Sequence, residues 1–114
     1  MRTLLFLGLA AGLAAPVMAS DRTGYQAIAV GDYQKAEETL LVERRIFPRR
    51  PELMINLATV YARTGRVAEA AALYRTAMQV EPVEMVLPDG VLASSHEVAQ
   101  RGVNSLGRTA LAVR

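Results

Sequence analysis

The chain has 114 residues, a hydrophobic fraction of 52% and a formal net charge of +2 at pH 7. This length leaves room for one small domain, and the near-balance of 13 basic and 11 acidic residues argues against electrostatic capture of nucleic acid. Cysteine is absent, which excludes disulfides, thiolate metal sites and a cysteine nucleophile.

Residues 1–19 have the layout of a secretory signal peptide. Arg2 gives a positive start, residues 4–15 are apolar, and Val17 and Ala19 stand at the two positions that a signal peptidase reads. We expect cleavage after Ala19 and export to the periplasm or beyond, with membrane contact only through this transient leader. The alternative is a retained membrane anchor, but the apolar run is shorter than the roughly 20 residues that a spanning helix needs.

Two segments of the chain repeat each other at an offset of 34 residues, and this is the clearest signal in the sequence. Residues 31–36 recur as residues 65–70. A period of this size is typical of repeats built from a helix, a tight turn and a second helix. The same offset relates four pairs of residues: Gly31 and Gly65, Ala36 and Ala70, Leu40 and Tyr74, and Pro48 and Pro82.

In the later copy, residues 51–82, the spacing predicts two packed helices. Met54, Leu57, Ala58 and Tyr61 share one face of an α-helix. We expect Gly65 to form the turn, because glycine readily takes the left-handed conformation that ends many helices.

The stretch 51–82 closely resembles a complete tetratricopeptide repeat. The resemblance implies that Ala70, Tyr74 and Ala77 are the packing residues of the second helix and that Pro82 ends it. Small residues at Ala58 and Ala70 let two antiparallel helices approach closely. A proline has no N–H to donate, so we expect the second helix to stop there.

The earlier copy, residues 20–50, is partial. Its second half, from Gly31 to Pro48, matches the later copy, but its first helix is shortened to about residues 21–30. Gly24 and Ala27 stand where the small and the large packing residues belong, and we expect Tyr25 to fill some of the missing volume. About three such repeats are normally needed for stability, so another segment must cover the exposed end.

The C-terminal third is predicted to cover that end. Residues 83–93 contain two short apolar runs around Pro88-Asp89-Gly90, which favours a small β-hairpin. Residues 94–114 are predicted to form a capping helix, from Ser95 to about Leu106, and a tail. A capping box between Ser94 and Glu97 is expected to open the helix. Alternatively, the apolar stripe of this helix makes a homodimer contact.

The sequence offers no set of residues for catalysis or metal binding. His96 is the only histidine, and Gln100 stands where a zinc-protease helix would carry a second one. We therefore expect a non-enzymatic protein without metal or cofactor. The densest basic cluster, at residues 44–50, is interpreted as a solvated face or as a site for an acidic or phosphorylated partner, because it lacks the interleaved aromatic residues of a nucleic-acid site.

The resemblance also implies a peptide-binding groove lined by the first helix of the complete repeat. The expected groove residues are Glu52, Ile55, Asn56, Thr59 and Arg63. An asparagine amide can donate to and accept from an extended backbone, and an arginine can pair with a carboxylate.

The sequence thus predicts an all-α fold of about two tetratricopeptide-type hairpins with a short β-hairpin and a capping helix. Its predicted role is an exported module that binds a peptide or protein partner of unknown identity. The alternative is a structural assembly subunit that forms homo-oligomers through its C-terminal helix.

Overall fold

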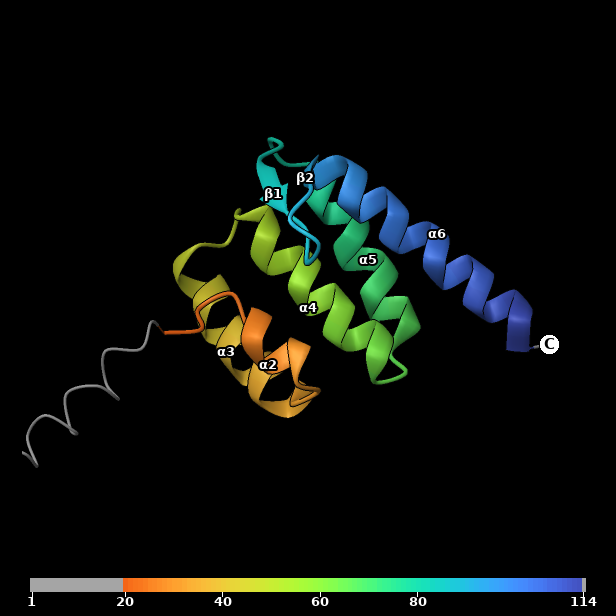
Figure 1. Cartoon of the computed structure of the whole chain (residues 1–114), viewed down its shortest axis with the longest axis horizontal. Helices are drawn as coiled ribbons and strands as arrows, with labels where there is room; N and C mark the ends of the chain where they lie inside the picture. The colour runs from red at the N-terminus through yellow and green to blue at the C-terminus, as the bar shows by residue number, and fades with distance from the viewer. Residues whose placement is uncertain (1–19, 114) are drawn as a thin grey trace, which may run out of the picture.

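The computed structural model describes residues 20–113, with the side chains of residues 20–107. This part of the chain is mostly helical, with a small two-stranded antiparallel sheet (Figure 1). The sequence predicted this combination of helices and one hairpin. The elements in chain order are α2 (Tyr25–Ala29), α3 (Tyr33–Ile46), α4 (Pro51–Arg63), α5 (Val67–Ala77), β1 (Glu84–Val86), β2 (Leu92–Ser94) and α6 (Ser95–Val113).

The predicted signal peptide and its cleavage after Ala19 lie outside the described residues and stay predictions. From residue 20 to residue 113, no helix has both the length and the apolar character that crossing a bilayer requires.

The two glycines of the sequence repeat end their helices in the same way. Gly31 has a φ of +80° and Gly65 a φ of +82°. The amide after Gly31 donates to the carbonyl of Ala27 at 2.8 Å, and the amide after Gly65 donates to the carbonyl of Tyr61 at 2.7 Å. Both are the hydrogen bond that closes a Schellman motif, in which a left-handed residue follows the helix end. The offset of 34 residues is therefore repeated in the local geometry.

Helices α4 and α5 form the antiparallel pair predicted from the later copy of the repeat (Figure 1). Ala58, Ala70 and Ala77 have no exposed surface. Their small side chains let the two helix backbones approach closely. Tyr74 is buried between them, and its hydroxyl lies 3.1 Å from the hydroxyl of Thr59.

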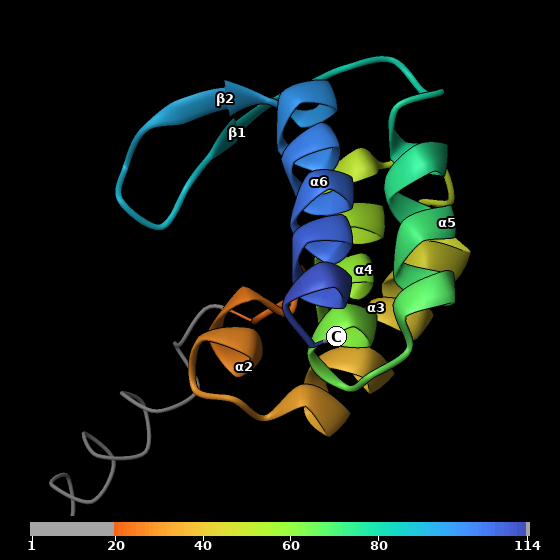
Figure 2. The ribbon, with the colours of Figure 1, turned by 90° about the vertical axis from the view of Figure 1, so that its right-hand side faces the viewer.

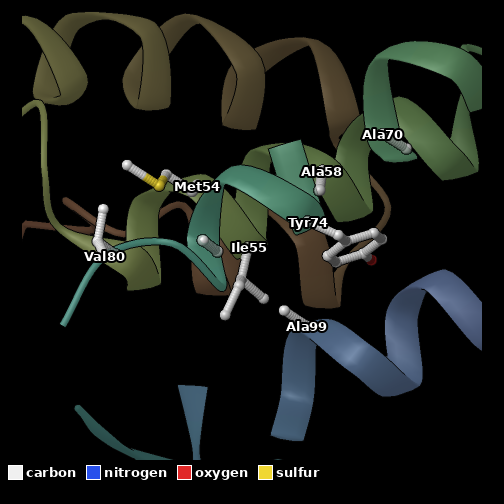
Figure 3. Packing of buried hydrophobic residues seen from close by; sticks show 8 residues of the cluster. Met54, Ile55, Ala58, Ala70, Tyr74, Val80 and Ala99 are labelled. Atoms are coloured by element: carbon white, nitrogen blue, oxygen red, sulfur yellow. The ribbon is translucent and has the colours of Figure 1, made fainter. Parts of the chain in front are cut away.

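Helix α4 lies at the centre of the molecule and contributes to two hydrophobic clusters. One cluster joins α4 to α5, the segment after α5, and α6, and Figure 3 shows Ala99 of α6 pointing towards Ile55 of α4. This cluster consists of Met54, Ile55, Ala58, Ala70, Tyr74, Ala77, Val80 and Ala99.

The other cluster joins the opposite side of α4 to α2 and α3. Leu53, Leu57 and Val60 of α4 are almost fully buried there, and burying a leucine side chain contributes about 1.5 to 3 kcal/mol to folding. Two other residues of the predicted repeat are not part of the buried core. Tyr61 is half-buried, and Pro48 is exposed, two residues beyond the end of α3. The second cluster consists of Ala27, Ala36, Leu40, Leu53, Leu57 and Val60.

Helix α2 is short, as the partial first copy predicted, and the chain before it is held by Asp21. The two carboxylate oxygens of Asp21 accept hydrogen bonds from the amides of Gln26 and Ala27, at 3.1 and 2.9 Å. The expectation that Tyr25 fills the missing core volume is wrong, because its side chain is 47% exposed. Gly24 instead brings the backbone against Leu40, whose Cδ1 would lie 3.1 Å from an added Cβ.

The predicted hairpin forms, with Met85 opposite Ala93 and Val86 opposite Leu92. Its turn follows the Pro88-Asp89-Gly90 signal. The amide of Gly90 donates to the carbonyl of Leu87 at 2.8 Å, and Gly90 has a φ of +86°. A turn followed by a left-handed glycine is a common three-residue hairpin connection.

Helix α5 ends earlier than predicted. Its last residue is Ala77, and the amides of Met78 and Gln79 make short-range bonds to carbonyls three residues back. Pro82 therefore does not end the helix. Beyond the helix end, Val80 is buried in the core.

Two residues at the start of α6 fasten it to the segment that follows α5. Ser95 is fully buried: its amide donates to the carbonyl of Val83 at 2.8 Å, and its hydroxyl accepts from the amide of Val83 at 3.0 Å. A ring nitrogen of His96 lies 2.7 Å from the carbonyl oxygen of Val80. The only histidine of the chain thus has a structural partner.

The predicted capping box is wrong in its second half. The hydroxyl of Ser94 does accept from a helix amide, that of His96 at 3.2 Å. The Glu97 carboxylate, however, pairs with Arg101 one helical turn later, at 2.8 Å, instead of reaching back to Ser94. Helix α6 also continues to Val113, beyond the predicted end near Leu106.

Candidate peptide-binding cleft

A cleft of about 510 Å³ lies between the hairpin and the helices α2 and α4. In Figure 2 the hairpin extends to the same side of α4 as α2, while α5 lies on the other side. Strand β1 and the turn form one wall, and the other comes from α4 and the start of α2. The lining residues are Thr23, Tyr25, Glu52, Asn56, Glu84, Met85, Val86, Leu87, Pro88 and Gly90.

The floor of the cleft is fixed by Asn56. Its side-chain amide donates to the carbonyl of Thr23 at 2.8 Å, which holds the chain before α2 against α4. The sequence predicted that this amide binds an extended backbone. It binds the backbone of its own chain, and so it positions Tyr25 at the rim of the cleft.

The hairpin wall is fixed by its base. Ser95 holds Val83 through both of the hydrogen bonds described above, and Ala93 of β2 is buried. Met85 of β1 packs against the cluster formed by α4, α5 and α6. An isolated two-stranded hairpin is only marginally stable in water, so these contacts are what keep the wall in place.

Of the five predicted groove residues, the structure brings Glu52 and Asn56 to the cleft. Ile55 is 3% exposed and faces the core beneath α6. Thr59 is half-buried beside Tyr74, with its hydroxyl donating to the carbonyl of Ile55 at 3.0 Å. The guanidinium of Arg63 donates to the hydroxyl of Tyr33 at 3.0 Å, away from the cleft lining.

Sequence reasoning missed Tyr25 and the hairpin residues as cleft-lining positions. The turn signal at Pro88-Asp89-Gly90 revealed the hairpin, but nothing in the spacing showed that it would fold towards α2. That direction is set by the hydrogen bonds of buried Ser95 to Val83 and by the packing of Met85 on the cluster of α4, α5 and α6, which are contacts between distant parts of the sequence.

The ionised groups that line the cleft are the carboxylates of Glu52 and Glu84, and no arginine or lysine of the described residues joins them. One oxygen of Glu52 is buried and accepts no hydrogen bond from any part of the chain that the structure describes. Leaving a buried acceptor without a donor lowers the stability of the fold by about 1 to 3 kcal/mol, and the loss is larger when the acceptor is charged. The two carboxylates of the lining make the cleft suited to a ligand that brings a positive charge or hydrogen-bond donors.

A second, more apolar cleft of about 520 Å³ lies at the junction of α3 and α4 and shares Glu52 with the first. Here the guanidinium of Arg50 stacks on the ring of Phe47, with 4.1 Å between its carbon and the ring centroid. Part of the basic cluster predicted at residues 44–50 is therefore engaged with an aromatic side chain of its own chain.

Among the side chains of residues 20–107, no three histidines, aspartates or glutamates come together as a metal site would require. The cleft offers backbone groups, two carboxylates and apolar side chains. Neither a protein-family model, nor a curated protein, nor a solved structure matches the chain.

Proposed function

We propose that this chain is an exported, non-enzymatic interaction module of the tetratricopeptide type, which binds a peptide segment of a partner protein in the cleft beneath the hairpin. The observation that carries the proposal is the cleft itself, because it joins a half-exposed tyrosine, apolar side chains and two carboxylates at one open site. A few polar groups placed in a largely apolar cleft are typical of binding sites.

The repeat-like assignment has two supports in addition to the sequence period. The glycine-ended turns at Gly31 and Gly65 share one hydrogen-bond pattern. The alanines at equivalent positions, Ala36 and Ala70, are both fully buried. In this proposal α2 and α3 form the shortened first unit, α4 and α5 form the complete second unit, and the hairpin and α6 close the open end.

The proposed function is tested by site-directed photo-crosslinking in the cells that make the protein. A benzophenone side chain replaces Tyr25, which is 47% exposed at the rim of the cleft, and a matched control replaces Val67, which is 46% exposed and outside the cleft lining. We expect one defined partner segment to be captured from position 25 and not from position 67. Equal capture from both positions, or none from position 25, would contradict the proposal.

A second candidate function is assembly of several copies through α6. This helix has 19 residues and α5 has 11, a difference of about 12 Å at a rise of roughly 1.5 Å per residue. Figure 1 shows the end of α6 continuing past the helices on which it packs. Light scattering over a dilution series checks this role, and a monomer at every concentration would contradict it.

A further inference from the structure

The hairpin presents one strand edge to the cleft. The hydrogen bonds from the amide of Leu87 to the carbonyl of Val91 and from the amide of Ser95 to the carbonyl of Val83 are both 2.8 Å long. In an antiparallel ladder, hydrogen-bonded and non-hydrogen-bonded pairs alternate. Met85 and Ala93 are then a hydrogen-bonded pair, while Glu84 and Val86 direct their backbone groups away from β2.

Glu84 and Val86 therefore place two N–H and two C=O groups along the outer edge of β1. None of the described residues beyond the hairpin forms a backbone hydrogen bond to either of them. An open edge of this kind is a template for pairing with another extended chain. Both residues line the cleft, whereas Leu92 and Ser94 on the opposite edge do not.

We propose that the occupant of the cleft is an extended, basic peptide segment that adds to β1 as a third strand. This inference rests on the proposed function and specifies the partner of the same site. In strand addition, main-chain hydrogen bonds provide affinity and pockets for alternate side chains provide specificity. The edge offers pairing over about three residues, or roughly 10 Å of strand.

Charge complementarity selects a basic segment. The carboxylates of Glu52 and Glu84 lie on the two walls of the cleft, one on α4 and the other on β1. A lysine or arginine between them receives an acceptor from each wall. An acidic segment at the same place meets two like charges.

Binding is measured by fluorescence anisotropy on the full chain, with a labelled peptide Thr-Val-Lys-Val-Thr-Val and companions carrying norleucine or glutamate in place of lysine. We expect the lysine peptide to bind most tightly and the glutamate peptide most weakly. Glu84→Gln should weaken binding of the lysine peptide about two- to fivefold, as for a partly exposed ion pair. The matched control Glu38→Gln, an exposed position on α3, should leave binding unchanged.

The strand edge is tested with two prolines. Val86→Pro removes an N–H from the edge in the cleft, and Leu92→Pro removes the equivalent N–H from the far edge. The N–H groups of both residues point away from the other strand of the hairpin, and proline is tolerated at such edge positions. We expect Val86→Pro to weaken peptide binding about tenfold, on the order of one lost hydrogen bond, and Leu92→Pro to have little effect.

Peptide variants keep the test valid if Val86→Pro disturbs the hairpin. N-methylation at successive peptide residues should weaken binding at every second position, because only alternate amides face the partner strand. Weakening without this alternation, or equal binding of the lysine and glutamate peptides, overturns the inference. Neither result affects the crosslinking comparison between positions 25 and 67, which tests the proposed function separately.

Discussion

Gly102 of α6 lies against the ring of Tyr74 on α5, so closely that a Cβ at position 102 would be 2.4 Å from Cζ of that ring. Glycine at this place lets the two helix backbones come together over the buried tyrosine. A glycine inside a helix lowers helix stability by up to about 1 kcal/mol relative to alanine. The packing of α6 on Tyr74 offsets this loss. The residue therefore positions the capping helix.

Gly102→Ala should destabilise the fold, although alanine is the better helix former. The added methyl group must displace a ring that is 6% exposed, and overpacking of this kind costs about 1 to 3 kcal/mol. Gly107→Ala is the matched control on the same helix, because an added Cβ there meets no side chain or other segment of the described residues within 4 Å, and it should raise stability slightly. Urea unfolding measures both variants, and a stabilised Gly102→Ala would contradict the contact.

Ser95→Ala should loosen the base of the hairpin. It removes the hydroxyl that accepts from the amide of Val83 at 3.0 Å, and leaving a buried donor without a partner costs about 1 to 3 kcal/mol. The measurement is hydrogen exchange at the hairpin amides together with urea unfolding. Ser105→Ala, at an exposed position of α6, should change neither the hydrogen exchange nor the urea stability. An equal effect of the two variants would contradict the role assigned to the Ser95 hydroxyl.

The ion pair between Glu37 on α3 and Arg66 in the α4–α5 turn predicts a pH effect. Two hydrogen bonds, of 3.0 and 2.6 Å, join their side chains, and donation by Arg66 lowers the pKa of Glu37 below its usual range. A carboxyl with a lowered pKa stabilises the fold above its unfolded-state pKa, and this contribution is lost as the pH falls through the folded-state value. Glu37→Gln should therefore lower the melting temperature at neutral pH.

The difference in melting temperature between the parent chain and Glu37→Gln should disappear in acid, below the pKa of Glu37 in the fold. Thermal unfolding of both proteins from pH 7 downwards checks this. A difference that persists unchanged in strong acid would show that the pair does not act through the charge of Glu37.

Ala70→Trp should unfold or strongly destabilise the chain. Ala70 has no exposed surface where α5 meets α4, so a large ring there forces the helices apart at a cost of at least about 1 to 3 kcal/mol. Ala72→Trp, two residues along the same helix and exposed, is the control. Far-ultraviolet circular dichroism during heating distinguishes them, and coincident curves would refute the packing of α4 on α5.

The parts of the fold that sequence reasoning predicted are those controlled by local geometry. The turn after the helix end could be predicted at the repeated glycines, Gly31 and Gly65, because glycine readily takes the left-handed conformation that follows many helix ends. Ala58 and Ala70 had to be buried because their periodicity placed them on facing sides of two helices. The hairpin at residues 83–93 followed from its turn residues, and all of these features are present in the structure.

The candidate site was predicted less completely because it depends on long-range packing. Ile55 and Thr59 occupy groove positions by analogy, but α6 and Tyr74 cover them. Tyr25 was assigned to the core although it lies at the cleft rim. The close approach of Gly102 to the ring of Tyr74 on another helix also leaves no trace in the spacing of one segment.

Each helix from α2 to α6 packs mainly on the helix that precedes or follows it along the chain. In such neighbour-to-neighbour architecture most contacts join segments that are close in the sequence, and helical proteins rich in local contacts fold in microseconds to milliseconds. We expect structure to grow outward from α4, whose two faces nucleate both clusters. The last parts to become ordered should then be the hairpin and the far end of α6.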